Sequence, residues 1–393
     1  MKKLIISSVY DFLLFGLLNC VPYRSLTTFF YKKNSVDYLK KKNIEIVSLL
    51  DYIDDENLRI EITNYSLFEK HCLDSENNIN IDFLLSKFNE CIRLLINDIN
   101  TTDLYDNSVI YAVGPSSFDL FADKVFDSVK KKNIKIIAWH DDMHAYSRIH
   151  YLQRTDIIKE NYSLSLPIEE LIFNKNAFNN SSAILTHSKP YLDYLNLNIY
   201  NSKTIQYYAP PDDLIFSMFT PSNFYQRKKK ILASGNVRGY PLREFISYKI
   251  KSNNIDAISI YDYLPSSIAS KNINDIKNNN FYAYYLKLSQ YRGSFVGLHS
   301  KPIDFVVYKV FESLCVGTLL FCEYNENLDK LGLIKFEHYV PMYSNNLLDK
   351  EYIDKYLDTD EGLKIATNGY NFAKNFFNTK KHLDFFVDTI NRL

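Results

Sequence analysis

The sequence predicts an α/β protein made of two domains, each a parallel sheet covered by helices. The chain has 393 residues, and a single hydrophobic core stops growing near roughly 250 to 300 residues. Short β-branched segments alternate with helical segments along both halves, which is typical of strand–helix–strand units. A polar, proline-containing segment at 209–230 separates the two halves, and we expect it to be the linker.

The first half, residues 1–208, is expected to form an N-terminal domain. The expected strands are residues 4–9, 44–49, 108–113, 134–139 and 183–187. One expected helix ends near residue 43, and two others cover 83–99 and 119–132. The opening apolar stretch to Leu18 could imitate a signal peptide, but Asp11 interrupts it and no small-residue cleavage site follows. We therefore interpret this stretch as beginning with a buried strand.

The second half is expected to form a C-terminal domain at 231–380, followed by a helix at 381–393 that packs back on the first domain. The expected strands are residues 231–234, 257–261, 295–298, 318–322 and 338–342, and the expected helices are 241–251, 281–290, 305–316 and closing helices to 393. In open parallel sheets, ligands bind beyond the carboxyl ends of the strands. Residues that carry chemistry are therefore expected in the loops that follow strands, along a cleft between the domains.

Composition and missing motifs exclude several classes. The 46 basic side chains equal the 46 acidic ones, which argues against a general nucleic-acid binder. Five cysteines without a Cys-x-x-Cys pair indicate a reducing, cytoplasmic setting, and we expect no transmembrane segment. The chain lacks Gly-x-Gly-x-x-Gly, Gly-x4-Gly-Lys-Ser/Thr, Gly-x-Ser-x-Gly and His-Glu-x-x-His, which argues against dinucleotide enzymes, P-loop NTPases, α/β-hydrolases and zinc proteases.

The first candidate site follows the expected strand 231–234. Gly235 and Gly239 permit close backbone approach, and Arg238 and Arg243 could neutralise a diphosphate. A departing nucleoside diphosphate gathers negative charge, which prearranged cations stabilise. A capped turn with surface arginines would show the same pattern.

The second candidate is the pair Asp304 and Glu312, eight residues apart and followed by Gly317 and a strand. This segment resembles the donor-site signature of retaining GT-B glycosyltransferases, Glu-x7-Glu, with Asp304 in place of the first Glu. The apolar residues between them would also suit an ordinary helix with two carboxylates on its exposed face.

The resemblance, which covers roughly residues 180–393, implies a GT-B fold of two Rossmann-like domains and transfer of a sugar from a nucleotide-diphosphate sugar. It implies that Arg238 and Arg243 bind the donor pyrophosphate, Glu312 the ribose and Asp304 the transferred sugar. The segment from Lys309 to Glu312, Lys-Val-Phe-Glu, is similar to the Lys-x-Phe-Glu variant of less typical members. Retention of the anomeric configuration, independence from a metal or other cofactor, and a glycan, lipid-linked or protein acceptor are further expectations of this resemblance.

Three further residues complete the expected donor site. His299 and Ser300 precede Asp304 and could touch the donor phosphate, and Tyr261 ends the expected strand 257–261.

The third candidate is the segment from Trp139 to His144 at the end of an expected N-terminal strand. His140 and Asp141 are candidates for catalytic contacts and His144 for the acceptor side. The same histidines and aspartates could instead bind a metal or only shape the loop. We expect no metal.

Other acceptor-side candidates follow strands of the N-terminal domain. They are Ser8 and Tyr10 after the first strand, Ser116 in a Gly-Pro-Ser-Ser turn, and His187 at the end of 183–187. Many GT-B enzymes have glycines after the first strand, and this chain has none there. A hydrogen-bonded structural role is the alternative for His187.

Two conspicuous charge clusters are interpreted as surface. The basic run at 226–230 is expected to open a strand, and Asp358 and Asp360 to lie at an acidic helix boundary. Two other functions stay open: a nucleotide-sugar epimerase or hydrolase on the same fold, and a catalytically silent binding module.

Overall fold

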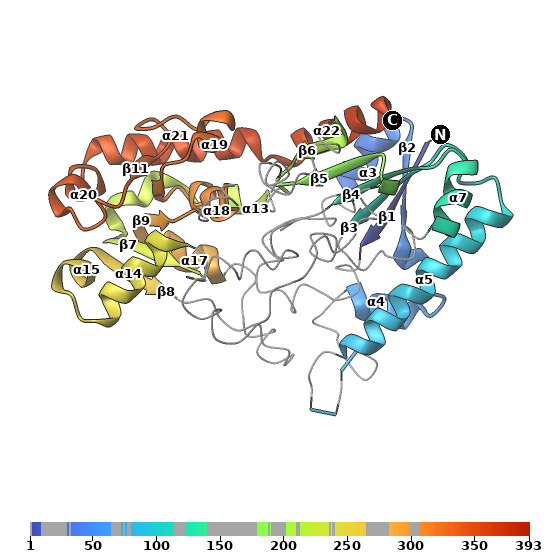
Figure 1. Cartoon of the computed structure of the whole chain (residues 1–393), viewed down its shortest axis with the longest axis horizontal. Coiled ribbons are helices and arrows are strands. Elements are labelled where there is room, and N and C mark those ends of the chain that lie inside the picture. The colour runs from blue at the N-terminus through green and yellow to red at the C-terminus, as the bar shows by residue number, and fades with distance from the viewer. Residues whose placement is uncertain are drawn as a thin grey trace, which may run out of the picture.

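The computed structural model shows two α/β lobes beside one another (Figure 1). It describes residues 2–8, 30, 33–63, 72–73, 75–76, 80–113, 123–139, 179–187, 189, 202–209, 213–235, 237, 240–264, 283–298 and 306–393. One lobe holds a six-stranded sheet and the other a five-stranded sheet. None of the helices in these ranges is long and apolar enough to cross a membrane.

The N-terminal lobe has the strand order β2-β1-β3-β4-β5-β6, with every neighbouring pair parallel. Its strands are β1 (Lys2–Ser8), β2 (Ile44–Ser48), β3 (Val109–Val113), β4 (Lys135–Trp139), β5 (Ala183–Thr186) and β6 (Thr204–Gln206). Its described helices are α3 (Lys33–Lys41), η2 (Leu49–Tyr52), α4 (Glu56–Thr63), α5 (Ile81–Thr101) and α7 (Asp123–Lys131). Each of the five strands expected from the sequence is present within about two residues.

Alternating side chains divide the core of this lobe between the two faces of its sheet. Ile5 and Ile110 pack with α5 on one face, whereas Leu4, Ile6 and Tyr111 belong to the cluster on the other. Successive strand residues point to opposite faces, so both faces of this parallel sheet need helical cover.

The C-terminal lobe has the strand order β11-β10-β9-β7-β8, again all parallel. Its strands are β7 (Lys228–Ser234), β8 (Tyr261–Leu264), β9 (Tyr291–Val296), β10 (Leu319–Glu323) and β11 (Val340–Met342). Its described helices are α13 (Leu214–Met218), η6 (Pro221–Gln226), α14 (Pro241–Lys251), α15 (Ile255–Ile260), α17 (Ala283–Ser289), α18 (Lys309–Cys315), α19 (Glu326–Lys330), α20 (Lys350–Leu357) and α21 (Asp360–Phe376).

The expected strand at 257–261 is wrong. Residues Ile255–Ile260 form the helix α15, and Asn254 caps it by accepting a hydrogen bond from the Ala257 N–H at 3.0 Å. The strand β8 begins only at Tyr261. A short apolar run has no periodicity that separates helix from strand, and here the cap favours the helix.

The segment between the sheets contributes to the C-terminal lobe. Ile215, Phe216 and Phe219 of this segment are buried in the same cluster as α18. β7 begins at Lys228, inside the range expected to be linker.

The last helix, α22 (Thr379–Arg392), crosses to the N-terminal lobe, where Figure 1 shows it near the chain's N-terminus. Leu383, Phe386 and Ile390 join the cluster on the β1 and β3 face. The Phe386 ring lies 4.8 Å from that of Tyr111. This face of the N-terminal sheet is therefore covered by α22 together with α3.

Candidate functional site

The candidate site is built on the turn that follows β7. Gly235 begins this turn with a φ of +100°, a left-handed conformation that favours glycine. Its N–H donates to the Leu264 carbonyl at 3.0 Å, and its carbonyl accepts from the Tyr263 hydroxyl at 2.6 Å. The turn is thus fixed to the carboxyl end of β8.

Two basic side chains from different helices flank Gly235. A methyl group at Gly235 would lie 2.7 Å from Cε of Lys309 and 3.1 Å from Nη1 of Arg243. Arg243 lies in the first turn of α14, and Lys309 is the first residue of α18. The missing side chain therefore lets two cations approach one backbone turn, as expected if this turn binds an anion.

Arg243 is held at this position by its surroundings. Its side chain is buried, with 2% exposed, and donates from Nη2 to the Gly297 carbonyl at 3.0 Å. The guanidinium carbon lies 4.1 Å from the centre of the Tyr240 ring, a cation–π contact. Burial lowers the pKa of Arg243, while Tyr240 and other neighbours raise it, and the group stays protonated at neutral pH.

A glycine also brings α14 close to the sheet. A methyl group on Gly297, just beyond β9, would lie 3.3 Å from the Arg243 backbone nitrogen, closer than side chains usually approach. The start of α14 therefore packs against the carboxyl end of β9.

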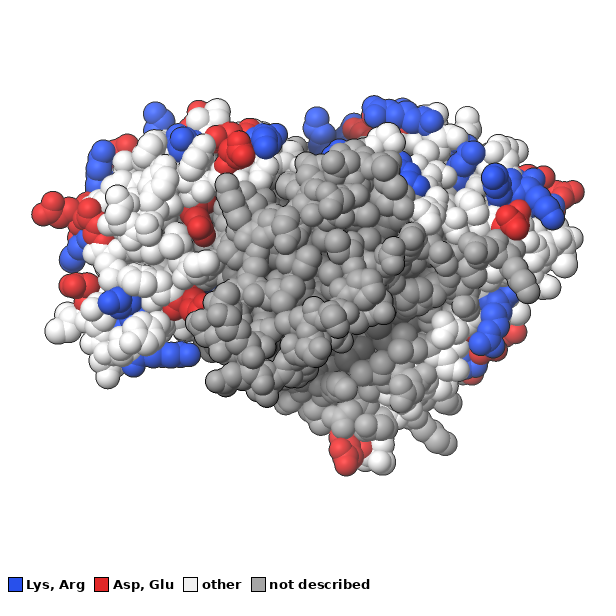
Figure 2. Space-filling view, viewed as in Figure 1, with Lys and Arg blue, Asp and Glu red and all other residues white. Residues whose placement is uncertain are grey.

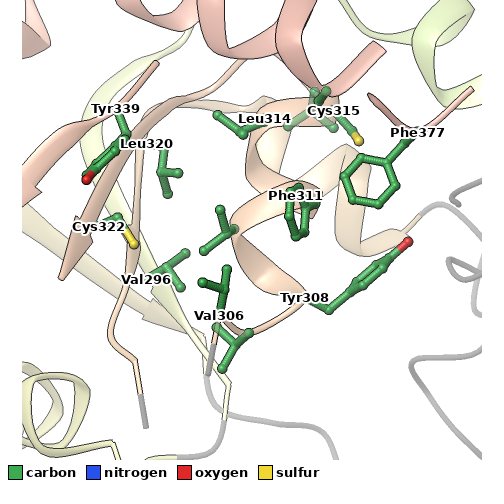
Figure 3. Close-up of a cluster of buried hydrophobic side chains, with 14 of the residues drawn as sticks. Val296, Val306, Tyr308, Phe311, Leu314, Cys315, Leu320, Cys322, Tyr339 and Phe377 are labelled. Carbon is green, nitrogen blue, oxygen red and sulfur yellow. The ribbon is translucent and has the colours of Figure 1, made fainter. Parts of the chain in front are cut away.

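The helix α18 presents Lys309 and Glu312 while its other side anchors it in the core. Phe311, Leu314 and Cys315 extend into the cluster shown in Figure 3. Lys309 Nζ lies 3.8 Å from a carboxylate oxygen of Glu312, which is only 4% exposed. The predicted helix stripe is therefore present, but Glu312 does not lie on an exposed face as the alternative interpretation required.

Three residues that the sequence analysis missed complete the described site. The Tyr284 hydroxyl lies 2.8 Å from Ser234 Oγ, and its ring centre lies 4.2 Å from Lys309 Nζ. Glu323 ends β10, and its carboxylate accepts from the Leu298 N–H at 2.8 Å. Tyr263, the third, was hidden by the misplaced strand. Glu323 directly follows the expected strand 318–322, so the rule that sites follow strands could have found it.

Tyr261 does not belong to this site, contrary to our expectation. It begins β8 instead of ending a strand, is 1% exposed, and donates its hydroxyl to the Leu347 carbonyl at 2.8 Å. Its ring packs in the core cluster on the opposite side of β7. The misplaced strand explains the error, because it put Tyr261 at the wrong edge of the sheet.

On the N-terminal side, His187 follows β5 and connects to α18 through Tyr208. The His187 and Tyr208 rings stack at 5.9 Å and 22°. Tyr208 in turn lies 4.9 Å from Phe311 and donates its hydroxyl to the Val306 carbonyl at 3.1 Å. His187 is 4% exposed, and the contact places it where the two lobes meet.

Ser8 is the last residue of β1 and pairs in register with Val113 at the end of β3. The remaining predicted residues, His140, Asp141, His144, Tyr10, Ser116, Arg238, His299, Ser300 and Asp304, lie outside the described residues. Among the residues that are described, no group of three histidine, cysteine or acidic side chains could hold a metal ion.

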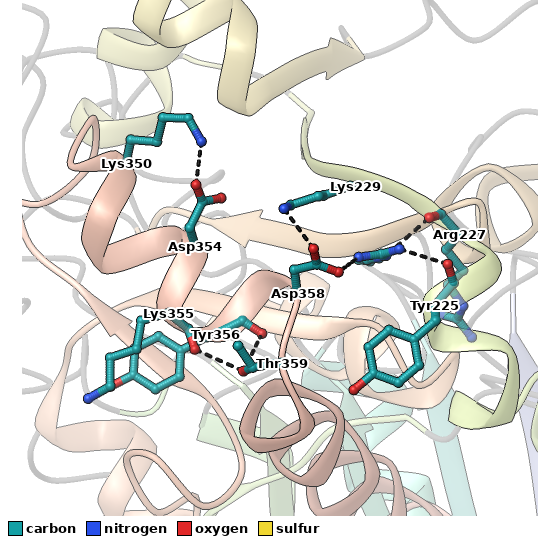
Figure 4. A network of polar contacts seen from close by, with 10 residues as sticks. Tyr225, Arg227, Lys229, Lys350, Asp354, Lys355, Tyr356, Asp358 and Thr359 are labelled. Atoms are coloured by element: carbon teal, nitrogen blue, oxygen red, sulfur yellow. Dashed lines mark hydrogen bonds and ion pairs between the residues drawn. The ribbon is translucent and has the colours of Figure 1, made fainter.

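The conspicuous basic run contacts Asp358 at the amino end of β7 (Figure 4). Asp358 accepts from Lys229 at 2.7 Å and also from Arg292. Asp360 accepts from the Tyr225 hydroxyl at 2.5 Å. The predicted surface role of these charges fits this network.

Arg227, within the same run, is a buried exception. It is 5% exposed and donates to the carbonyls of Thr220, Val316 and Gly317 at 2.6 to 3.1 Å. Burial lowers its pKa to about 10. It connects the start of β7 to the turn after α18.

The described geometry can bind an anion beside hydroxyl groups. Arg243 and Lys309 supply positive charge at a glycine turn, and the buried Glu312 supplies a carboxylate on the same helix as Lys309. A diphosphate ester with a neighbouring diol has the matching chemistry.

No family model matches the sequence, and no curated protein matches it. Solved structures do match in fold. Sucrose-phosphate synthase from Thermosynechococcus elongatus has a TM-score of 0.54 at 11% identity, over 100% of this chain and 98% of that one. HepE of Anabaena, solved with UDP and glucose, has a TM-score of 0.53 at 11% identity, over 100% of both chains.

An α-glucosyltransferase solved with UDP and a 13-mer DNA containing a central A:G mismatch has a TM-score of 0.53 at 14% identity, over 100% of both chains. These proteins are GT-B glycosyltransferases. The chain therefore has the GT-B fold, which confirms the predicted fold class.

Proposed function

We propose that this chain is a glycosyltransferase that moves a sugar from a nucleoside-diphosphate sugar to an acceptor. The observation that carries the proposal is the convergence of Lys309 and Arg243 on Gly235. This point lies at the carboxyl end of β7, where open parallel sheets bind ligands. The same fold occurs in proteins solved with UDP, which supports a nucleotide at this edge.

The proposed chemistry follows from where the charges lie. Breaking the glycosidic bond leaves negative charge on the departing diphosphate, and Arg243 and Lys309 stabilise it in the transition state. Arg243 needs little reorganisation, because burial, the Tyr240 ring and the Gly297 carbonyl already hold it. Arg238 is proposed as a further cation on the same turn, and His299 and Ser300 as phosphate contacts.

The sugar end of the donor is assigned to the two carboxylates of the motif. Glu312 is proposed to accept the ribose hydroxyls and Asp304 to contact the transferred sugar. Retention of configuration is part of the proposal and rests on the resemblance of this motif. NMR of the first-formed product would show the donor's anomeric configuration, and the opposite anomer would reject retention.

We propose that the reaction needs no metal ion, because two side-chain cations already supply positive charge at the turn. Turnover should then be the same in EDTA as with added Mg²⁺ or Mn²⁺. Loss of turnover in EDTA that returns with a metal would contradict this part of the proposal.

Each lobe is proposed to bind one substrate: residues 231–380 bind the donor, and residues 1–208 bind the acceptor. His187 supports this division, since Tyr208 connects it to α18. His140 and Asp141 are proposed for catalytic contacts, and Ser8, Tyr10, Ser116 and His144 for acceptor contacts. We propose that the protein acts in the cytoplasm.

The acceptor is proposed to be a glycan, a lipid-linked sugar or a protein. One protein of similar fold was solved with DNA. On the described parts of the face shown in Figure 2, however, basic and acidic side chains occur side by side. The equal totals of 46 basic and 46 acidic side chains also argue against the excess positive charge of a nucleic-acid binder. A salt-sensitive mobility shift with duplex DNA would contradict this choice of acceptor.

The test is a thermal-shift panel of UDP-, GDP-, ADP- and CMP-sugars on the wild type, Arg243→Ala and Lys364→Ala. A donor at 100 times its Kd should stabilise the fold by about 2.7 kcal/mol. The stabilisation should disappear in Arg243→Ala and persist in Lys364→Ala, which removes an exposed lysine of α21. No stabilisation by any donor would reject the proposal.

Two outcomes would favour the alternatives instead. Turnover of the donor with no acceptor present would favour an epimerase or hydrolase. Donor binding without turnover across a broad acceptor panel would favour a silent binding module.

A further inference from the structure

A second groove lies on the C-terminal lobe and has a lining different from that of the candidate donor site. It has a volume of about 460 Å³ and is lined by Glu337, His338, Asn368, Asn371, Phe372, Asn375 and Phe376. One end of the lining, His338, precedes β11 at the amino edge of the sheet. At the other end, Phe376 stacks on Phe311 of α18, two residues after Lys309. Figure 1 shows α21 along one margin of the lobe and β8 along the other. The two sites share no residue.

Three asparagines give the groove a row of neutral polar groups. Asn368, Asn371 and Asn375 are spaced by three and four residues on α21, so they share one helix face. Along the helix axis they span about 10 Å, comparable with the length of a disaccharide. Within the described residues their side-chain amides form no hydrogen bond. Each amide therefore keeps its donors and its acceptor for a ligand.

Aromatic rings lie beside this row and are rigidly supported. Phe372 and Phe376 stack at 5.6 Å and 16°. Phe376, 38% exposed, also stacks on Phe311 of α18 at 5.9 Å and 5°. His338 lies 5.0 Å from Phe372. Because part of the Phe376 ring stays exposed beside the amides, this surface suits a ligand that has both apolar C–H groups and hydroxyl groups.

The charge of the groove restricts the ligand further. Its lining contains no lysine or arginine and one carboxylate, Glu337. Burial lowers the pKa of His338 although Glu337 opposes it, so this ring is neutral at pH 7. An anionic ligand would find no cation here, and a neutral ligand fits.

We propose that this groove binds a neutral saccharide chain and so holds a glycan on the outer face of the C-terminal lobe. The asparagine amides bond its hydroxyls, and Phe372 and Phe376 pack against its rings. The proposal does not depend on the transferase assignment, since it concerns binding and involves none of the residues assigned to the donor.

The test is direct binding by saturation-transfer difference NMR. Maltohexaose, cellohexaose and chitohexaose are the probes, titrated into the full chain. The double variant Asn371→Ala/Asn375→Ala removes two exposed amides, which leaves the core intact. Lys364→Ala on the same helix is the control. We expect at least one probe to bind, with at least tenfold weaker binding in the double variant and unchanged binding in the control.

The proposal would be overturned by no binding of any probe to the wild type, or by equal binding to the double variant. Displacement of the bound probe by excess UDP or GDP would also overturn it, because the probe would then occupy the donor site. Phe376→Leu gives an independent check that keeps an apolar side chain against Phe311. It should weaken binding without lowering the melting temperature by more than a few degrees.

Discussion

The two ends of β7 carry two clusters of positive charge that differ in construction. At the amino end, Lys228, Lys229 and Lys230 are adjacent in sequence and are matched by the carboxylates of Asp262 and Asp358. At the carboxyl end, Arg243 and Lys309 come from separate helices and converge on a glycine.

The difference indicates which of the two charge clusters forms a binding site. Adjacent charges in a sequence are usually solvated and paired, and such exposed pairs contribute little to stability. Arg243 and Lys309 are far apart in the sequence, and only the packing of their two helices brings them together at the glycine turn. We expect changes at the amino end to alter stability alone and changes at the carboxyl end to alter donor binding.

Arg227→Met should have the largest effect, on stability. It keeps much of the side-chain volume but leaves the buried carbonyls of Thr220, Val316 and Gly317 without their donor. A buried acceptor left without its donor typically costs about 1 to 3 kcal/mol, and here three carbonyls lose theirs. Urea unfolding measures this loss, and the donor Kd of the folded variant should match the wild type. A raised donor Kd would contradict the proposal that the amino end of β7 affects stability alone.

Gly235→Ala should affect both properties. Its methyl group would be strained at a φ of +100° and would lie 2.7 Å from Lys309 Cε, so we expect a loss of about 1 to 3 kcal/mol in stability. Donor binding should weaken at least tenfold, because Lys309 must move. Calorimetric titration with the donor measures this.

Gly332→Ala is the matched control for Gly235→Ala. Gly332 also has a left-handed backbone, with a φ of +85°, but a methyl group there would lie 3.6 Å from its nearest neighbour, Phe372. Stability should fall while donor binding stays unchanged. Equal loss of donor binding in both variants would show that backbone strain, and not the position of Lys309, is responsible.

Lys309→Met and Lys228→Met remove one charge each from opposite ends of the strand region. Lys309→Met should raise the donor Kd about tenfold, equivalent to roughly 1.4 kcal/mol. Lys228→Met should leave it unchanged, since Lys228 contacts Asp262 at the other edge of the sheet. The comparison is made at low and at physiological salt. If both variants weaken binding equally, a general electrostatic field and not a local contact attracts the donor.

Asp262→Asn should have the smallest effect and one that depends on pH. Partial burial raises the pKa of Asp262, but hydrogen bonds from Lys228, Lys230 and Tyr291 outweigh it and lower the pKa to about 2. Because the folded pKa lies below its usual value, the carboxylate stabilises the fold above about pH 4 and loses this effect as the pH falls toward 2.

We therefore expect the wild type to be about 1 kcal/mol more stable than Asp262→Asn at pH 6, after allowance for solvent screening. The difference should vanish near pH 2 in urea unfolding curves. A difference of the same size at both pH values would mean that the aspartate acts through packing and not through its charge.

Most of the fold could be predicted from the sequence, because alternation of β-branched runs and amphipathic helices is a local signal. The strand at 257–261 failed because its signal was equally local but ambiguous, and the cap at Asn254 decided it. Because of that single error, Tyr261 was predicted to belong to the donor site and Tyr263 was not.

The site was predictable only in part. Gly235, Arg243, Lys309 and Glu312 each carried a recognisable pattern, but nothing in the sequence indicates that Lys309 and Arg243 meet at Gly235. The contact depends on how α14 and α18 pack on the sheet, which involves Gly297 and the Phe311 cluster. Tyr284 belongs to no recognisable motif, so only its contacts with Ser234 and Lys309 in the structure assign it to the site.

The crossing of α22 has a consequence for how the chain folds during synthesis. The face of the N-terminal sheet formed by Leu4, Ile6 and Tyr111 is completed by Phe386 and its neighbours. The ribosome makes these residues after every strand of both sheets. The part of this apolar face that α22 covers therefore stays exposed until the second lobe has been synthesised, whereas Leu39 of α3 covers another part from the start. Exposed apolar surface of this kind attracts chaperones or other chains. Completion of the N-terminal core is therefore tied to a helix that is synthesised after the second lobe.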